Sequence, residues 1–358
     1  MNSNQKTYTA VLVTAVYVIL LLLPGCAPKE ESIPQQLTPP VEPIQEVVVQ
    51  DIPLAGQAAA TRAEFSGLAW YGDWLVMLPQ YPDRFGSGSL FALPKETLLQ
   101  AVAGQSTQAL EPIAIPFEDG GLRQQIQGFE GFECIVFSGD QVYLSIEAQP
   151  KKMLGYLVQG TVQAGAQGTF SIQLDPATLT EVQPQANLDN YSDESCIVYK
   201  DQLVTLYEAN GVQVNPAPLA HIFDMELEAQ DTLSLPNIEY RLTDASEVDS
   251  EGRFWAINYL FPGDVFKLKP AEKDGQDALA QQYGEGLTHS QNIAVERLVQ
   301  FQIDSDKISM VDTPPIQLVL EGDTSARNWE GIVRFDRTGF LLVTDSFPKT
   351  LLGFVPYP

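Results

Sequence analysis

The chain has 358 residues, of which 44% are hydrophobic and 18% are charged. It can therefore bury a sizeable core, which excludes an intrinsically disordered protein. Its 46 acidic residues against 20 basic ones give a formal net charge of −26. Because such a charge repels phosphate backbones and anionic headgroups, we expect no nucleic-acid partner and no electrostatic docking on a membrane. Two histidines and three cysteines are too few for histidine-based zinc chemistry or a disulfide-rich scaffold.

The N-terminus has the pattern of a bacterial export signal with a lipid attachment site. Lys6 precedes an apolar run of 14 residues, 10–23. This run has the length of a signal peptide, whereas a membrane-spanning helix needs roughly 20 residues. The run ends in Leu-Pro-Gly-Cys at 23–26, which resembles a lipobox, although the proline before the glycine is less usual than a small residue. The sequence therefore predicts lipidation of Cys26. An uncleaved N-terminal anchor and an ordinary secreted protein are the alternatives.

This N-terminus predicts a division of the chain into three parts. Residues 1–25 would be a lipoprotein signal peptide, 26–46 a Pro-rich tether and 47–358 the folded domain. A Pro-rich polar segment favours an extended conformation and buries little. The domain would then lie in the bacterial cell envelope, on the extracytoplasmic side of a membrane, where its lipid anchor holds it.

From residue 47 onward, short apolar runs alternate with turns of Gly, Pro, Asn and Asp, which indicates an all-β domain. Five segments share a strand, a turn with Gly or Asp, and a second strand that ends on a polar residue. They start at Phe65, Phe132, Asp193, Ala245 and Trp329, at intervals of 52 to 84 residues. A constant unit with variable loops is typical of a repeat protein, and one such unit cannot cover both its faces. The repeat predicts a β-propeller of five blades, with six as the alternative; a β-sandwich would leave the repeat unexplained.

Two segments outside the repeat also carry predictions. The last unit has only three strand-like runs, and we expect residues 47–52 to supply its fourth strand and close the ring. Residues 274–295 are polar, and we expect a partly helical surface excursion in which His289 is exposed.

Short motifs around acidic residues resemble known proteins. They are FEGFE at 129–133, Ser246-Glu247, and the closing run NWEGIVRFDRTGFLLVTDSF, which begins at 328. These motifs resemble two related bacterial families of propellers, the phytase-like (esterase-like) domain family and the SdiA-regulated family. The resemblance covers roughly residues 65–358. It implies an extracytoplasmic propeller of five or six blades with acidic residues, and Ca²⁺, around the channel mouth.

Acidic residues recur at equivalent positions of the repeat. The first strand of each blade lines the channel of a propeller, so residues at the start of that strand should face one another. This position holds Ser66, Glu133, Glu194, Glu247 and Glu330. The second strand ends on Gln80, Glu147, Glu208, Asn258 and Asp345.

Many oxygen ligands around one channel suit Ca²⁺. The predicted metal ligands are Glu133, Glu194, Glu247, Glu330, Glu147, Glu208 and Asp345. Two alternatives remain: these acids hydrogen-bond backbone N–H groups of neighbouring blades, or they are solvated strand ends around a wet channel.

Cys134 and Cys196 follow two of these acids and would lie near the channel on adjacent blades. A disulfide requires Cα atoms within about 7 Å, and inner strands of neighbouring blades are often farther apart. We therefore expect two buried free thiols rather than a disulfide.

Three functions are compatible with the sequence. The first is a binding module that presents a propeller face to an envelope protein, a glycan or a small molecule, which the absence of a recognisable nucleophile motif favours. The second is a Ca²⁺-dependent hydrolase of an ester, lactone or phosphoester. The third is a propeller in which the metal only stabilises the fold.

Overall fold

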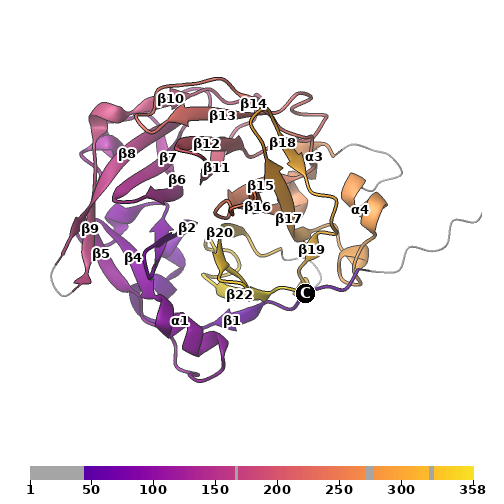
Figure 1. Cartoon of the computed structure of the whole chain (residues 1–358), viewed down its shortest axis with the longest axis horizontal. Helices are drawn as coiled ribbons and strands as arrows, with labels where there is room; N and C mark the ends of the chain where they lie inside the picture. Colours follow the sequence, from indigo (N-terminus) through magenta and orange to yellow (C-terminus); the bar gives the residue numbers. More distant parts are fainter. Residues whose placement is uncertain (1–43, 166–167, 271–276, 322–325) are drawn as a thin grey trace, which may run out of the picture. The chain divides into compact units, whose positions relative to one another are not determined.

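The computed structural model describes residues 44–165, 168–270, 277–321 and 326–358. The predicted signal peptide and Cys26 lie outside these residues. The described part is an all-β propeller in which sheets surround a common axis (Figure 1). Within it, no helix is both long enough and apolar enough to cross a bilayer.

The described strands follow one another as five antiparallel meanders of four strands. The first has β2 (Phe65–Tyr71), β3 (Trp74–Pro79), β4 (Ser89–Pro94) and β5 (Ile113–Glu118). The second has β6 (Phe129–Ser138), β7 (Gln141–Ala148), β8 (Leu154–Ala164) and β9 (Phe170–Leu174), with β10 (Thr180–Val182) beside β8. Parallel pairing of β5 with β9 joins these two meanders at their outer edges.

The remaining meanders repeat this order. The third has β11 (Asp193–Val198), β12 (Gln202–Tyr207), β13 (Leu219–Asp224) and β14 (Leu233–Ser234). The fourth has β15 (Arg241–Ala245), β16 (Arg253–Leu260), β17 (Val295–Ile303) and β18 (Ile308–Met310), with β19 (Ile316–Gln317) beside β17. The last has β20 (Trp329–Phe335), β21 (Gly339–Thr344), β22 (Leu352–Pro356) and β1 (Gln50–Ile52).

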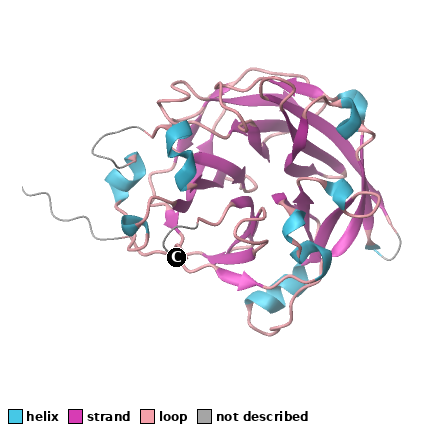
Figure 2. Ribbon diagram, turned by 180° about the vertical axis from the view of Figure 1, so that it is seen from behind, coloured by secondary structure: helices cyan, strands magenta, loops and turns pink. Residues whose placement is uncertain are grey.

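Short helices occur in the connections, and most of them lie at the periphery (Figure 2). The α-helices are α1 (Lys95–Val102), α2 (Leu122–Gln125), α3 (Val265–Leu268) and α4 (Ala278–Tyr283). The 3₁₀ helices are η1 (Gly56–Ala59), η2 (Thr61–Ala63), η3 (Pro82–Arg84), η5 (Pro176–Thr178), η6 (Pro262–Asp264) and η7 (His289–Gln291).

The inner strands β2, β6, β11, β15 and β20 each contact the next, and β20 contacts β2, so the ring is closed. Apolar cores lie between neighbouring meanders rather than in one centre. Middle strands such as β3 (WLVMLP) and β21 (GFLLVT) are therefore apolar on both faces. Burial on both faces explains why their sequence does not alternate.

The predicted closure by the N-terminal segment is confirmed for residues 50–52. β1 pairs antiparallel with β22, with Gln50 opposite Phe354 and Ile52 opposite Leu352. Val47 instead forms a parallel bridge to Leu318 in the fourth meander. The segment thus covers the edge of the last meander and also ties it to its neighbour.

The polar insert is partly helical, as expected, but His289 is not exposed. Its side chain is 4% exposed, and its Nδ1 lies 2.8 Å from Oε1 of Glu46. The Glu46 carboxylate also accepts hydrogen bonds from the backbone N–H and the hydroxyl of Thr288. The expectation failed because a residue at the end of the predicted tether folds against the insert and buries the histidine.

The expectation of free thiols at Cys134 and Cys196 is also wrong. The two cysteines form a disulfide, with their Cα atoms 5.9 Å apart. They lie on β6 and β11, the inner strands of the second and third meanders, which contact each other directly. Near the axis, neighbouring blades therefore approach closely enough for a covalent link.

Candidate functional site

Irregularities at the start of the inner strands direct acidic side chains out of the sheet ladders. In β2, β11 and β20 the pairing register shifts across Ser66, Glu194 and Glu330. In β6 a similar shift spans Glu133. A bulge residue has no partner on the neighbouring strand, and its side chain is turned away from the regular pleat. The repeat position that the sequence identified is thus a recurrent backbone feature in four meanders.

These positions line a cavity of about 240 Å³ at one mouth of the channel. The ends of the second strands contribute Gln80, Glu147 and Asp345 to the same cavity. The lining residues are Glu64, Phe65, Ser66, Gln80, Glu133, Glu147, Asn190, Glu194, Arg241, Asn328, Glu330 and Asp345. Of the seven predicted metal ligands, the structure brings five to this cavity: Glu133, Glu147, Glu194, Glu330 and Asp345.

Arg241, which the sequence analysis missed, lies among these acids. Its Nη2 is 3.7 Å from Oε2 of Glu194 and 3.7 Å from Oε1 of Glu330. Its Nε pairs with Glu208, the sixth predicted ligand, which is fully buried behind it. The rings of Tyr191 and Tyr259 lie 5.6 and 5.8 Å from the guanidinium carbon. One arginine therefore contacts several of the acids, although it compensates only one negative charge.

The seventh predicted ligand, Glu247, is not part of this cavity. β15 ends at Ala245, so Glu247 lies beyond the far end of its inner strand. It lines a separate cavity of about 200 Å³, together with residues from the later parts of the inner strands such as Val198 and Val333. Its Oε2 accepts a hydrogen bond of 3.2 Å from the backbone N–H of Arg334 on β20. For this residue, the structure fits the alternative of a backbone contact between neighbouring blades.

The comparison of the five repeated segments placed the fourth inner strand too late in the chain. The turn between β15 and β16 is long, so the strand begins at Arg241 and not at Ala245. In the register of the other meanders, Asp244 takes the position assigned to Glu247, beside a shift between Leu242 and Ala245. Its carboxylate is buried and accepts a hydrogen bond of 2.8 Å from the backbone N–H of Ile332. A charged RLTD run before Ala245 was the signal that could have revealed both Arg241 and Asp244.

The electrostatics of the cavity favour partial protonation of its acids. Burial, together with the charge of neighbouring Glu194, raises the pKa of Glu147 to about 8. Burial raises the pKa of Glu194 to about 7, although the nearby Arg241 guanidinium opposes the shift. Burial and the carboxylate of Glu147 also hold the pKa of Glu133 well above its usual range. Near neutral pH, these carboxyl groups are therefore partly protonated.

Several buried oxygen atoms at the cavity have no hydrogen-bond partner within the described residues. They are Oε1 of Glu147, Oε2 of Glu194 and Oδ1 of Asn328. Oε2 of Glu208, which lies behind Arg241, also has no hydrogen-bond partner. Buried acceptors are almost always satisfied, so each such atom calls for a donor, a water molecule or a cation. An all-oxygen donor set matches the preference of Ca²⁺. As arranged here, no three acidic, histidine or cysteine side chains of the described residues form a metal-binding group.

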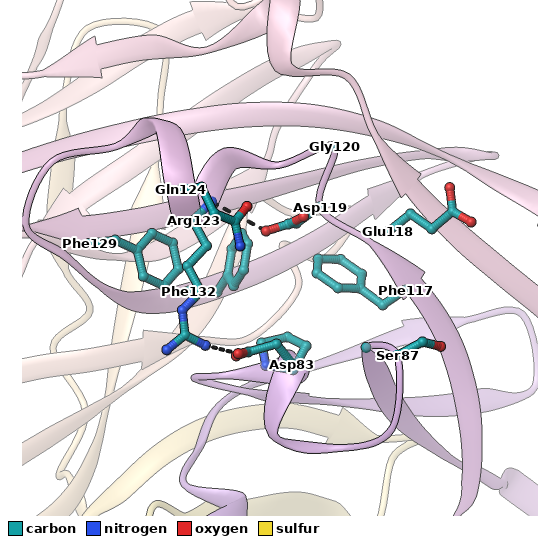
Figure 3. A pocket seen from close by; sticks show the side chains of 12 residues that line it. Asp83, Ser87, Phe117, Glu118, Asp119, Gly120, Arg123, Gln124, Phe129 and Phe132 are labelled. Carbon is teal, nitrogen blue, oxygen red and sulfur yellow. Dashed lines mark hydrogen bonds and ion pairs between the residues drawn. The ribbon is translucent and has the colours of Figure 1, made fainter.

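Another cavity, of about 260 Å³, lies between the first and second meanders (Figure 3). Phe117, Phe129 and Phe132 line it. Its central arginine, Arg123, points to Asp83 and forms an ion pair with it. Asp119 also lines this cavity, and its carboxylate accepts hydrogen bonds from the backbone N–H groups of Gly121 and Arg123.

No family model matches the chain, and no curated protein matches it. Among solved structures, it is similar to a glucose dehydrogenase at 11% identity, over 87% of this chain and 100% of that one, with a TM-score of 0.41. The soluble aldose sugar dehydrogenase of Escherichia coli has the same identity and coverages, with a TM-score of 0.42. A Cellvibrio cellulosa α-L-arabinanase mutant is 11% identical over 87% of this chain and 91% of that one, with a TM-score of 0.43. At this level the likeness carries no argument about function.

Proposed function

We propose that this protein is a lipid-anchored, extracytoplasmic binding module whose acidic channel mouth binds a cation, with Ca²⁺ as the first candidate. The observation that carries the proposal is the buried Oε1 of Glu147, which has no partner in a cavity where six carboxylates meet one arginine. Glu194, Glu208 and Glu330 form ion pairs with Arg241. Glu133 and Glu147 are the acids that a bound cation would compensate.

The donors that the cavity offers to Ca²⁺ include the carboxylates of Glu133 and Glu147 and the amide oxygen of Asn328. Gln80 contributes its Nε2, which donates a hydrogen bond of 3.0 Å to Oε1 of Glu133 and orients that carboxylate. Ca²⁺ tolerates irregular geometry and takes 6–8 oxygen ligands, some of them water. The remaining positions would therefore be filled by water or by oxygen atoms of a ligand at the channel mouth.

Thermal unfolding with calcium and with a chelator tests the metal. Calcium at a hundred times its dissociation constant should stabilise the wild type by about 2.7 kcal/mol, because the folded state alone offers the site. Glu147→Gln should lose most of this stabilisation. Its metal-free form should be at least as stable as the wild type, because Gln spares the folded state the cost of protonating a buried carboxylate.

Glu247→Gln is the matched control, since Glu247 lies at the opposite end of the inner strands. Its response to calcium should equal that of the wild type. Absence of a calcium shift in the wild type would refute the metal proposal. An unchanged shift in Glu147→Gln would instead remove Glu147 from the site.

A Ca²⁺-dependent hydrolase of an ester, lactone or phosphoester is the second candidate. The observation that favours it is the carboxyl of Glu194, whose pKa near 7 suits a general base at neutral pH. A panel of such substrates, assayed with calcium, should then show activity that Glu194→Gln abolishes. If no substrate is turned over, the binding module remains the better proposal.

The anchor and the location belong to the same proposal. They are supported by the apolar run at 10–23 and the cysteine at 26. The lipid on Cys26 attaches the protein to the membrane. The folded domain binds an envelope protein, a glycan or a small molecule. The resemblance to the phytase-like and SdiA-regulated families stays a prediction.

A further inference from the structure

A separate cavity of about 280 Å³ lies between the third and fourth meanders. It is close to the lower end of the ~300–1,000 Å³ that small-molecule sites occupy. One wall comes from the connections that flank β13 and β14, at Val212 and at Asn237 to Glu239. Helix α4 of the polar insert and Arg297 of β17 form the other wall. This cavity shares no lining residue with the acidic channel mouth.

Arg297 is held rigidly at this cavity. Its side chain is 3% exposed, and its Nη1 donates to both carboxylate oxygens of Asp277 at 3.0 and 3.1 Å. Its Nε donates to Oδ1 of Asn258 at 2.8 Å. Although burial alone would raise the pKa of Asp277, the Arg297 guanidinium and the backbone N–H of Ala280 hold that pKa below its usual value. The pair is therefore charged and fixed.

The contacts to Asp277 and Asn258 use Nε and Nη1 of Arg297 but not Nη2. Nη2 of Arg297 is buried and has no hydrogen-bond partner among the described residues. An unpaired buried donor is energetically costly, so a partner in the cavity would stabilise the structure. This partner must offer an acceptor oxygen at the position that Nη2 faces.

The rest of the lining defines the chemistry of the partner. Asp277 compensates the charge of Arg297, so the pair offers no net positive charge to attract an anion. Val212, Leu279 and Met310 provide an apolar surface. A suitable ligand is uncharged, carries a carbonyl oxygen for Nη2 of Arg297, and presents a small apolar group.

We propose that this cavity binds a neutral small molecule with an acetamido group, such as an N-acetylated sugar unit. The carbonyl oxygen accepts the hydrogen bond from Nη2 of Arg297, and the methyl group packs on the apolar surface. The proposal is independent of cation binding at the channel mouth.

The test uses the full-length protein in detergent with ¹³C-labelled methionine methyl groups. Met310 lines the cavity, whereas Met77, Met153 and Met225 lie outside its lining and serve as internal references. Titration with N-acetylglucosamine should shift the Met310 signal in a saturable manner. Glucose, which lacks the acetamido group, and N-acetylglucosamine 6-phosphate, which is anionic, should bind at least tenfold more weakly.

Two variants identify the site without touching the buried ion pair. Val212 is 42% exposed at the cavity, and Val212→Trp should fill the opening and weaken binding at least tenfold. Leu99→Trp is the matched control on α1, where Leu99 is 38% exposed, and it should bind like the wild type. Absence of a Met310 shift would show that only water satisfies Arg297 and would overturn the proposal. Unchanged binding by Val212→Trp, or tighter binding of the phosphate, would overturn it equally.

Discussion

At the scale of single residues, Arg241 divides the acidic cavity into two parts. Its guanidinium forms ion pairs with Glu194, Glu208 and Glu330. Within the described part of the chain, Glu133 and Glu147 form no ion pair, although both are buried. Uncompensated buried carboxylates are costly, so protons or a cation must neutralise them. This division is the reason that we propose cation binding beside Glu133 and Glu147.

The raised pKa of Glu147 predicts how stability depends on pH without calcium. The folded-state pKa of about 8 lies above the ordinary value of 4.5, so the folded state holds a proton that the unfolded state releases. The contribution of Glu147 to the free energy of unfolding should therefore be greatest below pH 4.5 and should fall as the pH rises towards 8. The slope for one group is at most about 1.4 kcal/mol per pH unit.

Urea unfolding with a chelator, from pH 5 to 8.5, measures this slope. Glu147→Gln should flatten it, because the substitution removes the titrating group. Glu181→Gln, at an exposed position on β10, is the control and should leave the slope unchanged. A wild type that gains stability over this range would contradict the prediction.

At the scale of elements, the contacts between inner strands connect the blades. β6 and β11 approach so closely that Cys134 and Cys196 bond, which closes a loop with a sequence separation of 62 residues. On the other side of the ring, Glu46 and β1 attach the start of the domain to the fourth and last meanders. Covalent and hydrogen-bonded links therefore supplement the apolar cores between blades.

Removal of the disulfide should destabilise the domain. A loop of this length lies between the cases of ~15 and ~100 residues, so the double variant Cys134→Ala/Cys196→Ala should lose about 4 kcal/mol of unfolding free energy. Denaturant unfolding measures this loss, and wild type treated with reductant under denaturing conditions is the control. The intact wild type should have a mass two hydrogens below that of the reduced form. Equal masses before and after reduction would show that the thiols are free.

At the scale of the whole molecule, the closed ring lacks an unprotected edge at its junction. β1 covers β22, which would otherwise offer free backbone groups to a second chain. The net charge of −26 also opposes association between copies.

Lipidation of Cys26 is the prediction at this scale. Cells fed labelled palmitate should incorporate the label into the wild type and into Cys134→Ala/Cys196→Ala. Cys26→Ala should carry no label, because the acceptor thiol is gone, and the protein should leave the membrane fraction. If the label does not depend on Cys26, the lipoprotein assignment is wrong.

Local patterns in the sequence were sufficient to predict the propeller, the closing strand and most of the acidic positions. Each of these depends on a repeated local signal, such as two apolar strands around a Gly or Asp turn followed by a polar residue. The start of β6, β11 and β20 could be read in this way because the turn after each strand is short. The turn after β15 is long, so the repeat pattern was matched to the wrong residues there. Glu247 was therefore assigned to the repeat position that Asp244 occupies in the structure.

Only the tertiary structure decided which side chains meet. The disulfide depends on how closely β6 and β11 approach at the axis, and no local pattern encodes that distance. The burial of His289 depends on Glu46, which is 243 residues away in sequence. The pairing of Arg241 with acids from three other strands has the same origin. Alternation and turn residues are short-range properties, whereas distances between blades and the compensation of buried charge arise when the ring closes.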